Sequence, residues 1–379
     1  MTVQPKGRPT QAIVDLEALS SNFRAAKRFI GPNVKYLAVV KANAYGHGAV
    51  ECAGRLEAEG ADWFGVVIPE EGLELRLAGI ERPILCLGSF WPGQEDMIVR
   101  HRLTPVVYLE QAAAALDRYA REHNQIVDIH VKIDTGMGRV GIPYQEASDF
   151  AEYLKTRSHL KVAGLMTHFA SAENPDENGF TGLQIERFNA ACDDFGNVGH
   201  APQWIDLANS PGAIIHPDSR GNLVRLGGAL YGLIDDILPA NIAQPDLKPV
   251  LSLRSRIANV KKIASGESLG YGRTFVAKRE SLIALVPIGY ADGFPRALSN
   301  RGRAYINGHV APVVGRISMD WTLLDVTDIP GAAIGDEVHL IGGDPDRSVS
   351  ATDIAGAVGT IGYEVTCGIS ARVPRVYIG

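Results

Sequence analysis

The 379-residue sequence has only four cysteines, and their spacing excludes the structures that cysteines usually support. They are Cys52, Cys86, Cys192 and Cys367, which form no Cys-x-x-Cys pair and have no histidine nearby at zinc spacing. This pattern indicates neither a disulfide framework nor a structural metal site. We therefore expect buried, reduced thiols.

Long apolar runs and clusters of positive charge are also missing. No run of about eighteen uncharged apolar residues occurs, and the first nine residues lack the apolar core of a signal peptide. The formal charge is −6 and the pI is near 5.9, with no cluster of Lys and Arg that would indicate nucleic acid or an anionic membrane as a partner. We expect a soluble, cytoplasmic enzyme that acts on a small molecule.

Short apolar runs alternate with amphipathic segments from about residue 34 to residue 230. The runs predict eight strands: Lys35–Val40, Trp63–Val67, Ile84–Leu87, Thr104–Val107, Val127–Ile133, Val162–Thr167, Trp204–Ala208 and Leu223–Leu226. The segments between them predict helices that include Gly48–Glu59, Glu70–Ala78, Leu109–Glu122, Gln145–Arg157 and Gln184–Asp194. This order favours an α/β fold of the (β/α)8 TIM-barrel type. A doubly wound open sheet is the alternative, but no Gly-x-Gly-x-x-Gly turn follows the first strand.

A second domain is expected after the barrel. The segment Ile237–Pro249 carries three prolines and no clear period, as a domain connector would. Beyond it, strands follow one another without helices, beginning with a predicted strand over Val250–Lys262, and Asn307-Gly308 predicts a tight hairpin. We predict a barrel over residues 1–240 and a mostly-β C-terminal domain over residues 241–379.

Polar side chains that could take part in catalysis lie where the predicted barrel strands end. Lys41 follows the first strand, where partial desolvation would favour a neutral, nucleophilic amine. Arg139 follows the fifth strand in a glycine-rich turn and offers a planar fork to a carboxylate or a phenolate. His168 follows the sixth strand. Taken singly, a solvated lysine, a surface arginine and a core histidine explain these residues as well.

The seventh and eighth strands end in sequences that suit phosphate. They are Asn209-Ser210 and Arg225-Leu-Gly227-Gly228, which offer a hydroxyl and glycine amides where barrels commonly bind a phosphate group. A strand-end lysine beside a phosphate cradle describes a pocket for a phosphorylated aldehyde, and pyridoxal phosphate is the simplest candidate.

These segments resemble those of alanine racemases, which are pyridoxal-phosphate enzymes built from a (β/α)8 barrel and a β domain. The resemblance extends nearly from end to end of the chain: Val40-Lys-Ala-Asn-Ala-Tyr-Gly-His-Gly48, Asp134-Thr-Gly-Met-Gly-Arg-Val-Gly141, Thr167-His-Phe-Ala170, Ala208-Asn-Ser210, Gly270-Tyr-Gly272, Ile288-Gly-Tyr-Ala-Asp-Gly293, Gly315-Arg-Ile-Ser-Met-Asp320 and Tyr363-Glu364. It implies an isomerase that interconverts L-alanine and D-alanine, for cell-wall synthesis or for breakdown of D-alanine.

The resemblance also implies a role for each site residue. Lys41 would hold the cofactor as a Schiff base, His168 would pack against its pyridine ring, and Arg225 would face the pyridine nitrogen and leave it unprotonated. The phosphate and the rest of the cofactor would be bound by Tyr45, Asn209, Ser210, Gly227, Gly228 and Tyr363. The substrate carboxylate would meet Arg139 and the amide of Met319, and its entry path would be lined by Tyr290, Arg296 and Arg316. Lys132 matches a position that is often carbamylated, where the added carboxylate would orient Arg139; an unmodified lysine or a salt bridge is the alternative.

Racemisation is easiest with one base on each face of the substrate. The resemblance implies Lys41 on one face and Tyr271, contributed by the partner subunit of a homodimer, on the other. A racemase of broader specificity and a barrel-type pyridoxal-phosphate decarboxylase remain alternatives. The decarboxylase is disfavoured because its β domain usually carries a reactive cysteine, whereas this region has only Cys367. A further alternative is a non-catalytic pyridoxal-phosphate carrier that consists of a single barrel. Residues 250–379 argue against it, because such a carrier has no β domain.

Overall fold

The computed structural model describes residues 7–174, 179–234, 238–239, 241–344 and 347–379. Contacts divide the chain into two compact units. The barrel unit contains Leu19–Ala44 and Gly48–Lys248, and the β unit contains the described residues up to Ala18, Tyr45–His47 and Pro249–Gly379. Residues 237 and 240 of the predicted connector lie outside the described part of the chain.

The barrel unit contains eight parallel strands, as the sequence predicts. They are β2 (Lys35–Val39), β3 (Trp63–Val66), β4 (Ile84–Cys86), β5 (Thr104–Val107), β6 (Val127–Asp134), β8 (Leu160–Met166), β9 (Trp204–Asp206) and β10 (Leu223–Leu226). Their order is β10-β2-β3-β4-β5-β6-β8-β9, with the short β7 (Ile142–Pro143) beside β6. Backbone bonds from Asn222 N to Ile205 O (3.1 Å) and from Arg225 N to Ala208 O (2.9 Å) join β10 to β9 and close the barrel.

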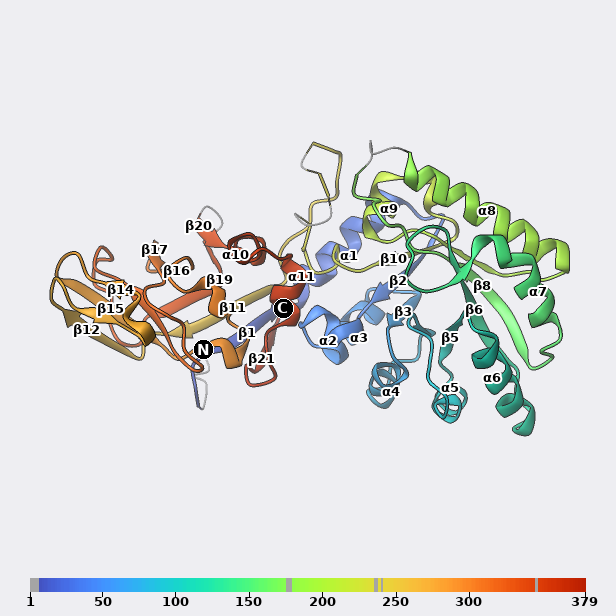
Figure 1. Ribbon diagram of the computed structural model, residues 1–379, viewed down its shortest axis with the longest axis horizontal. Coiled ribbons are helices and arrows are strands. Elements are labelled where there is room, and N and C mark those ends of the chain that lie inside the picture. The colour runs from blue at the N-terminus through green and yellow to red at the C-terminus, as the bar shows by residue number, and fades with distance from the viewer. Residues whose placement is uncertain (1–6, 175–178, 235–237, 240, 345–346) are drawn as a thin grey trace. The chain divides into compact units, whose positions relative to one another are not determined.

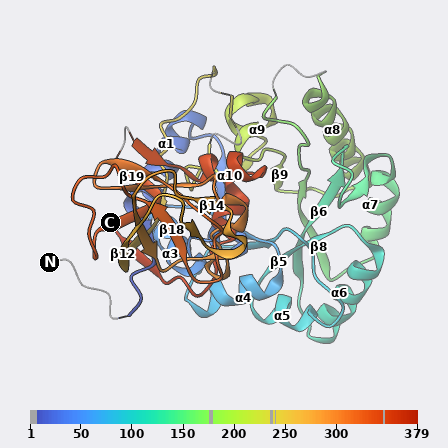
Figure 2. The ribbon, with the colours of Figure 1, turned by 60° about the vertical axis from the view of Figure 1, so that its left-hand side comes forward.

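Helices surround these strands on the outside of the barrel (Figures 1 and 2). They are α1 (Leu16–Ile30), which begins in the β unit, α3 (Ala49–Ala58), α4 (Pro69–Leu77), α5 (Glu95–Arg100), α6 (Glu110–Glu122), α7 (Ala147–Lys155), α8 (Phe180–Val198) and α9 (Ser210–Ile215), with 3-10 turns at Tyr144–Glu146 and Pro217–Ser219. In α6, Ala113, Leu116 and Ala120 are buried at helical spacing, so one face packs inward while the other stays polar.

The β unit is built from sheets with few helices. The largest sheet has the order β17-β16-β19-β11-β1-β21, with β20 beside β19. Its strands are β1 (Gln11–Asp15), β11 (Leu251–Arg256), β16 (Arg303–Ile306), β17 (His309–Pro312), β19 (Glu337–Asp344), β20 (Arg347–Val349) and β21 (Arg375–Ile378). A second sheet joins β12 (Asn259–Ile263), β15 (Ser281–Val286) and β18 (Thr322–Asp325), and a third joins β13 (Ser268–Leu269) and β14 (Phe275–Val276). The helical segments are α10 (Ala351–Val358), α11 (Gly362–Cys367) and 3-10 turns at Tyr271–Arg273, Tyr290–Asp292 and Arg296–Leu298.

The first strand of the chain lies in the β unit. β1 pairs antiparallel with β11 and parallel with β21, so Val14 stands opposite both Leu251 and Tyr377. Ala12 and Val14 are fully buried, which gives this short segment a strong reason to join the sheet.

The cysteines only partly match the expectation of buried thiols. Cys52 and Cys86 are buried, and burial raises the pKa of each thiol to about 12. Cys367 is exposed, because it ends the short helix α11 at the surface, so the expectation was wrong for this residue. Among the described residues, no helix has the length and apolar character needed to cross a membrane.

Candidate active site

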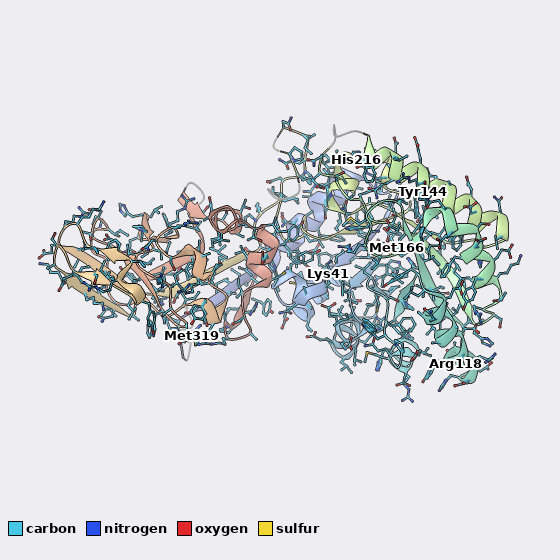
Figure 3. The ribbon with its side chains drawn as sticks, in the orientation of Figure 1. Lys41, Arg118, Tyr144, Met166, His216 and Met319 are labelled. Carbon is cyan, nitrogen blue, oxygen red and sulfur yellow. The ribbon has the colours of Figure 1, made fainter. Side chains whose placement is uncertain are left out.

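Lys41 lies where β2 ends, and the chain then turns with unusual handedness. Ala42, Asn43, Ala44 and Tyr45 all have φ between 52 and 54°, so α2 (Lys41–Tyr45) is a left-handed helical turn made of residues other than glycine. Such a conformation costs roughly 1–2 kcal/mol per residue and is found where surrounding contacts impose it. Lys41 is therefore followed directly by a strained segment, and Figure 3 shows the place of Lys41 in the barrel unit.

Contacts within the barrel unit hold this turn. The carboxylate of Glu71, in the first turn of α4, accepts hydrogen bonds from Ala42 N (2.7 Å) and Val67 N (2.8 Å). Asn43 Oδ1 accepts from Ala49 N at 2.8 Å, at the start of α3. The loops after β2 and β3 are thus tied together, which fixes the backbone on which Lys41 is carried.

Arg225, on β10, is buried inside the barrel and held by several acceptors. Its Nη1 donates to a carboxylate oxygen of Asp206, and its Nη2 donates to the carbonyls of Thr167 (2.9 Å) and Leu207 (3.0 Å). His168 Nδ1 lies 3.3 Å from the same Nη2. The guanidinium is therefore fixed by the ends of β8 and β9, in the barrel interior.

The buried charges shift the pKa values of their neighbours. Burial first, and Arg225 second, hold the pKa of Lys132 well below its usual value, while Asp206 and Asp134 oppose the shift. Burial also holds the pKa of His168 well below its usual value, helped by the positive charges of Arg225, Lys132, Arg139 and Lys41. Lys41, Lys132, Arg139 and Arg225 thus all act on one imidazole, which lies beside the Arg225 guanidinium.

The residues predicted to bind phosphate lie after the ends of β9 and β10. Ser210 is buried, and its Oγ accepts a hydrogen bond from Gly227 N at 2.9 Å. Asn209 caps α9, because its Oδ1 accepts from Gly212 N at 3.0 Å. Gly228 directly follows Gly227 in a turn in which Gly228 O accepts from Tyr231 N. Hydroxyl and amide donors thus meet at one edge of the barrel.

The glycine-rich turn that carries Arg139 is organised by Asp134. The carboxylate of Asp134 accepts from Gly136 N (2.9 Å) and from Gly138 N (3.1 Å). Arg139 itself is exposed. The turn is also tied to β8, since Thr135 Oγ1 lies 2.8 Å from Thr167 Oγ1.

Besides the three residues predicted to line the entry path, four predicted site residues belong to the β unit. The rings of Tyr45 and Tyr363 lie 5.4 Å apart between their centroids. Tyr271 is 72% exposed and Met319 is 52% exposed, which is unusual for large apolar side chains. Among the described residues, the backbone N–H of Met319 has no hydrogen-bond acceptor.

Two buried residues around the site were not predicted from the sequence. Asp206 neutralises Arg225, and Gln184 donates to Thr135 Oγ1 (3.0 Å) and to His168 O (3.1 Å) while its Oε1 accepts from Ala170 N. An aspartate inside the apolar run Trp204–Ala208 was the available signal for Asp206. Gln184 gave no such signal, because a glutamine in a helix is ordinarily exposed.

Comparisons with known proteins cover both units. Residues 14–235 match the family described as "Alanine racemase, N-terminal domain", and residues 250–377 match "Alanine racemase, C-terminal domain". The chain is 43% identical over 373 residues to an alanine racemase of Halothermothrix orenii, covering 98% of this chain and 97% of that protein.

Solved structures agree with these matches. An alanine racemase of Clostridium difficile superposes with a TM-score of 0.92 at 34% identity, covering 99% of this chain and 97% of that one. An alanine racemase of Bartonella henselae "with covalently bound pyridoxal phosphate" superposes with a TM-score of 0.88 at 29% identity, covering 98% of this chain and all of that one.

Proposed function

Since the chain belongs to the alanine racemase family, we propose how its residues divide the work of a pyridoxal-phosphate-dependent isomerase that interconverts L-alanine and D-alanine. The observation that carries this assignment of roles is geometric: Lys41, His168, Arg225 and Ser210 all lie at the ends of barrel strands, with His168 Nδ1 3.3 Å from Arg225 Nη2 and Ser210 Oγ 2.9 Å from Gly227 N.

The barrel residues fit the cofactor. Lys41 would bind it covalently, Ser210 with the amides of Gly227 and Gly228 would bind its phosphate, and His168 would pack on its ring. Tyr45, Asn209 and Tyr363 would complete the phosphate site, with Asn209 acting mainly through its cap on α9. Pyridoxal phosphate supplies an electron sink for the pair of electrons left when the α-proton is removed.

Arg225 would face the pyridine nitrogen. A guanidinium donates hydrogen bonds but does not give up its proton, so it would keep that nitrogen unprotonated and the electron sink modest. Arg225 would in this way favour return of the proton to the α-carbon over side reactions such as transamination.

Two bases would exchange the α-proton. Lys41 would act on one face of the substrate, and Tyr271 of the partner subunit would act on the other. The exposure of Tyr271 and Met319, together with Tyr290 and Trp321, supports an interface between two copies of the chain in this region. A homodimer with shared active sites follows from this division of labour.

The substrate carboxylate would be bound by Arg139 and by the N–H of the partner's Met319. Lys132 would be carbamylated and would orient Arg139. Its lowered pKa supports this role, because only a neutral amine attacks carbon dioxide, releasing one proton as the carbamate forms. The resulting carboxylate would lie near the positive charges of Arg139 and Arg225.

The direct test incubates the purified protein with pyridoxal phosphate and either L-alanine or D-alanine, and follows circular dichroism. The signal should decay to zero from both sides. An unchanged signal would contradict racemisation, and carbon dioxide released from lysine, ornithine or diaminopimelate would then point to a decarboxylase.

Variants assign the two bases. Lys41→Ala should abolish activity and the absorbance of the bound cofactor, whereas Lys35→Ala, at the exposed start of the same strand, should change neither. Tyr271→Phe should lower kcat/KM in both directions by about 100-fold or more, with Tyr153→Phe on the barrel surface as the control. Unchanged racemisation rates in Tyr271→Phe would show that Tyr271 is not the second base.

A further inference from the structure

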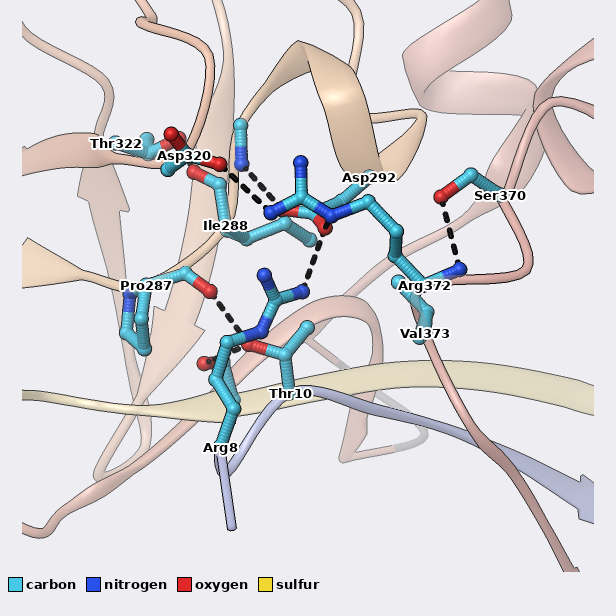
Figure 4. Close-up of polar contacts among 12 residues, drawn as sticks. Arg8, Thr10, Pro287, Ile288, Asp292, Asp320, Thr322, Ser370, Arg372 and Val373 are labelled. Carbon is cyan, nitrogen blue, oxygen red and sulfur yellow. Dashed lines mark hydrogen bonds and ion pairs between the residues drawn. The ribbon is translucent and has the colours of Figure 1, made fainter.

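A buried carboxylate in the β unit gathers two arginines from opposite ends of the sequence. The side chain of Asp292 is completely buried, and its Oδ1 lies 2.6 Å from Arg8 Nη2 and 3.5 Å from Arg372 Nε. Its Oδ2 accepts a hydrogen bond from Gly289 N at 3.0 Å. Figure 4 shows Arg8 and Arg372 converging on Asp292.

This cluster connects directly to the loop that carries Met319. Arg372 also reaches Asp320 Oδ1 through Nη2, at 2.7 Å, and Asp320 is the next residue after Met319. Two backbone bonds join the loops: Tyr290 N donates to Ser318 O and Ala291 N donates to Met319 O, each at 3.1 Å.

The two loops lie so close together that one of them requires glycine. A Cβ on Gly289 would come within 2.3 Å of Ser318 O and 2.4 Å of the Met319 carbonyl. Asp292 fixes Gly289 from one side and Arg372 fixes Asp320 from the other. The peptide at Met319 is therefore held between them, and a shift in either ion pair would be transmitted to its free N–H.

We propose that Asp292, with Arg8 and Arg372, is a positioning group that aims the N–H of Met319 at the carboxylate of the substrate. Arg8 gives the segment before β1 a part in substrate binding. The inference rests on the proposed role of Met319. A positioning effect on carboxylate binding alone should change KM rather than kcat, because the carboxylate is bound in the ground state and in the transition state alike.

The test measures steady-state racemisation, and separately the affinity for propionate, which has a carboxylate but no amino group. Arg372→Gln and Arg8→Gln should raise KM for both enantiomers about tenfold and change kcat less than about twofold. Propionate affinity should fall by a similar factor, while the absorbance of the bound cofactor before propionate is added stays as in the wild type. Arg372→Lys should lose less than Arg372→Gln, because it keeps the charge.

Arg279→Gln is the matched control, since Arg279 forms an exposed ion pair with Asp328 in the same unit. It should leave KM and propionate affinity as in the wild type. Unchanged KM and propionate affinity in folded Arg372→Gln and Arg8→Gln, or a loss of kcat alone, would overturn the inference. Because propionate affinity is read from cofactor absorbance without turnover, it tests the inference even if the wild type fails to racemise alanine, which would refute the proposed function instead.

Discussion

Individual buried ionisable side chains define the chemistry inside the barrel. Arg225 and Asp206 form an ion pair that is almost fully shielded from solvent, and the second oxygen of Asp206 has no hydrogen-bond donor among the described residues. Burial raises the pKa of Asp206 to about 6, although Arg225 and Lys132 both oppose the shift. Keeping Asp206 ionised therefore costs free energy, and its charge balances that of the buried Arg225.

Replacing Asp206 by asparagine keeps a hydrogen-bond acceptor for Arg225 but removes the compensating charge. We expect Asp206→Asn to lower the free energy of unfolding by about 1–3 kcal/mol, because Arg225 would be left as an unbalanced buried charge. Thermal or denaturant unfolding measures this loss. Asp128→Asn, in an exposed pair with Lys161, should cost less than about 0.5 kcal/mol. An equal loss of unfolding free energy in the two variants would show that the buried pair contributes no more to stability than the exposed pair.

His130, on β6, should make stability depend on pH. It is completely buried, neither ring nitrogen has a hydrogen-bond partner among the described residues, and burial lowers its pKa to about 3. The unfolded chain takes up a proton at this imidazole below about pH 6.5, whereas the folded chain does not. The stabilisation present above pH 6.5 is therefore lost as the pH falls towards 3, by about 1.4 kcal/mol per pH unit.

Between pH 7 and pH 5, the free energy of unfolding of His130→Gln should accordingly fall by about 2 kcal/mol less than that of the wild type. Denaturant unfolding at the two pH values measures this difference. It compares each protein with itself, so a general weakening of the variant does not enter. An equal loss in the two proteins would contradict the assignment of a neutral, buried imidazole.

Among the elements, the turn after β2 is the least ordinary. Its four left-handed residues are two alanines, an asparagine and a tyrosine. Asparagine adopts left-handed angles occasionally, but alanine and tyrosine by themselves favour a right-handed helix or an extended chain. The contacts of Glu71 and Asn43 impose the observed conformation instead.

Glycine should therefore be tolerated here and not in an ordinary helix. Ala42 is exposed, so Ala42→Gly removes the left-handed penalty, and we expect the free energy of unfolding to stay the same or to rise by up to about 1 kcal/mol. Ala112→Gly in α6 should lower it by about 1 kcal/mol, as in other right-handed helices. Denaturant unfolding compares the two, and a loss of similar size in both would argue against strain in the turn.

The elements also show what local sequence can and cannot predict. All eight barrel strands were predicted and are confirmed, because each is a short apolar run buried inside the barrel. The segment Val250–Lys262 was predicted as one strand but is two, β11 and β12, which belong to different sheets. β1 escaped prediction because its partners lie more than two hundred residues away along the chain. The left-handed turn was not predicted because tertiary contacts stabilise it, whereas the conformational preferences of its own residues do not.

The site shows the same limits. The residues at strand ends could be found because a barrel brings all such ends to one face. Asp206 and Gln184 could not, since their importance depends on what they contact across the barrel. The roles of the site residues, and the division at residue 240, stay predictions.

At the scale of the whole molecule, the residues proposed to carry the chemistry are divided between two units. Lys41 and Arg225 belong to the barrel unit, whereas Tyr271 and Met319 belong to the β unit. If the partner subunit supplies the latter two, a single chain cannot build a complete site alone.

Mixing two inactive variants tests this arrangement. After subunits of Lys41→Ala and Tyr271→Phe are exchanged, half of the dimers should be mixed, and each of these should hold one intact site. About a quarter of the wild-type activity should therefore return in the racemisation assay. Mixing Lys41→Ala with itself is the control. No recovery despite proven exchange would mean that both bases come from one chain.

The left-handed turn also bears on the configuration of the amino acids that form it. The backbone angles of Ala42 are the mirror image of those of a right-handed helix, and an amino acid of the D configuration prefers that region as strongly as an L-residue avoids it. A D-alanine placed at position 42 by chemical ligation would thus sit in its own energy minimum. The difference in free energy of unfolding between that semisynthetic chain and the natural one would measure the strain at Ala42. The substituted residue is D-alanine, which is also one of the two compounds that the enzyme interconverts.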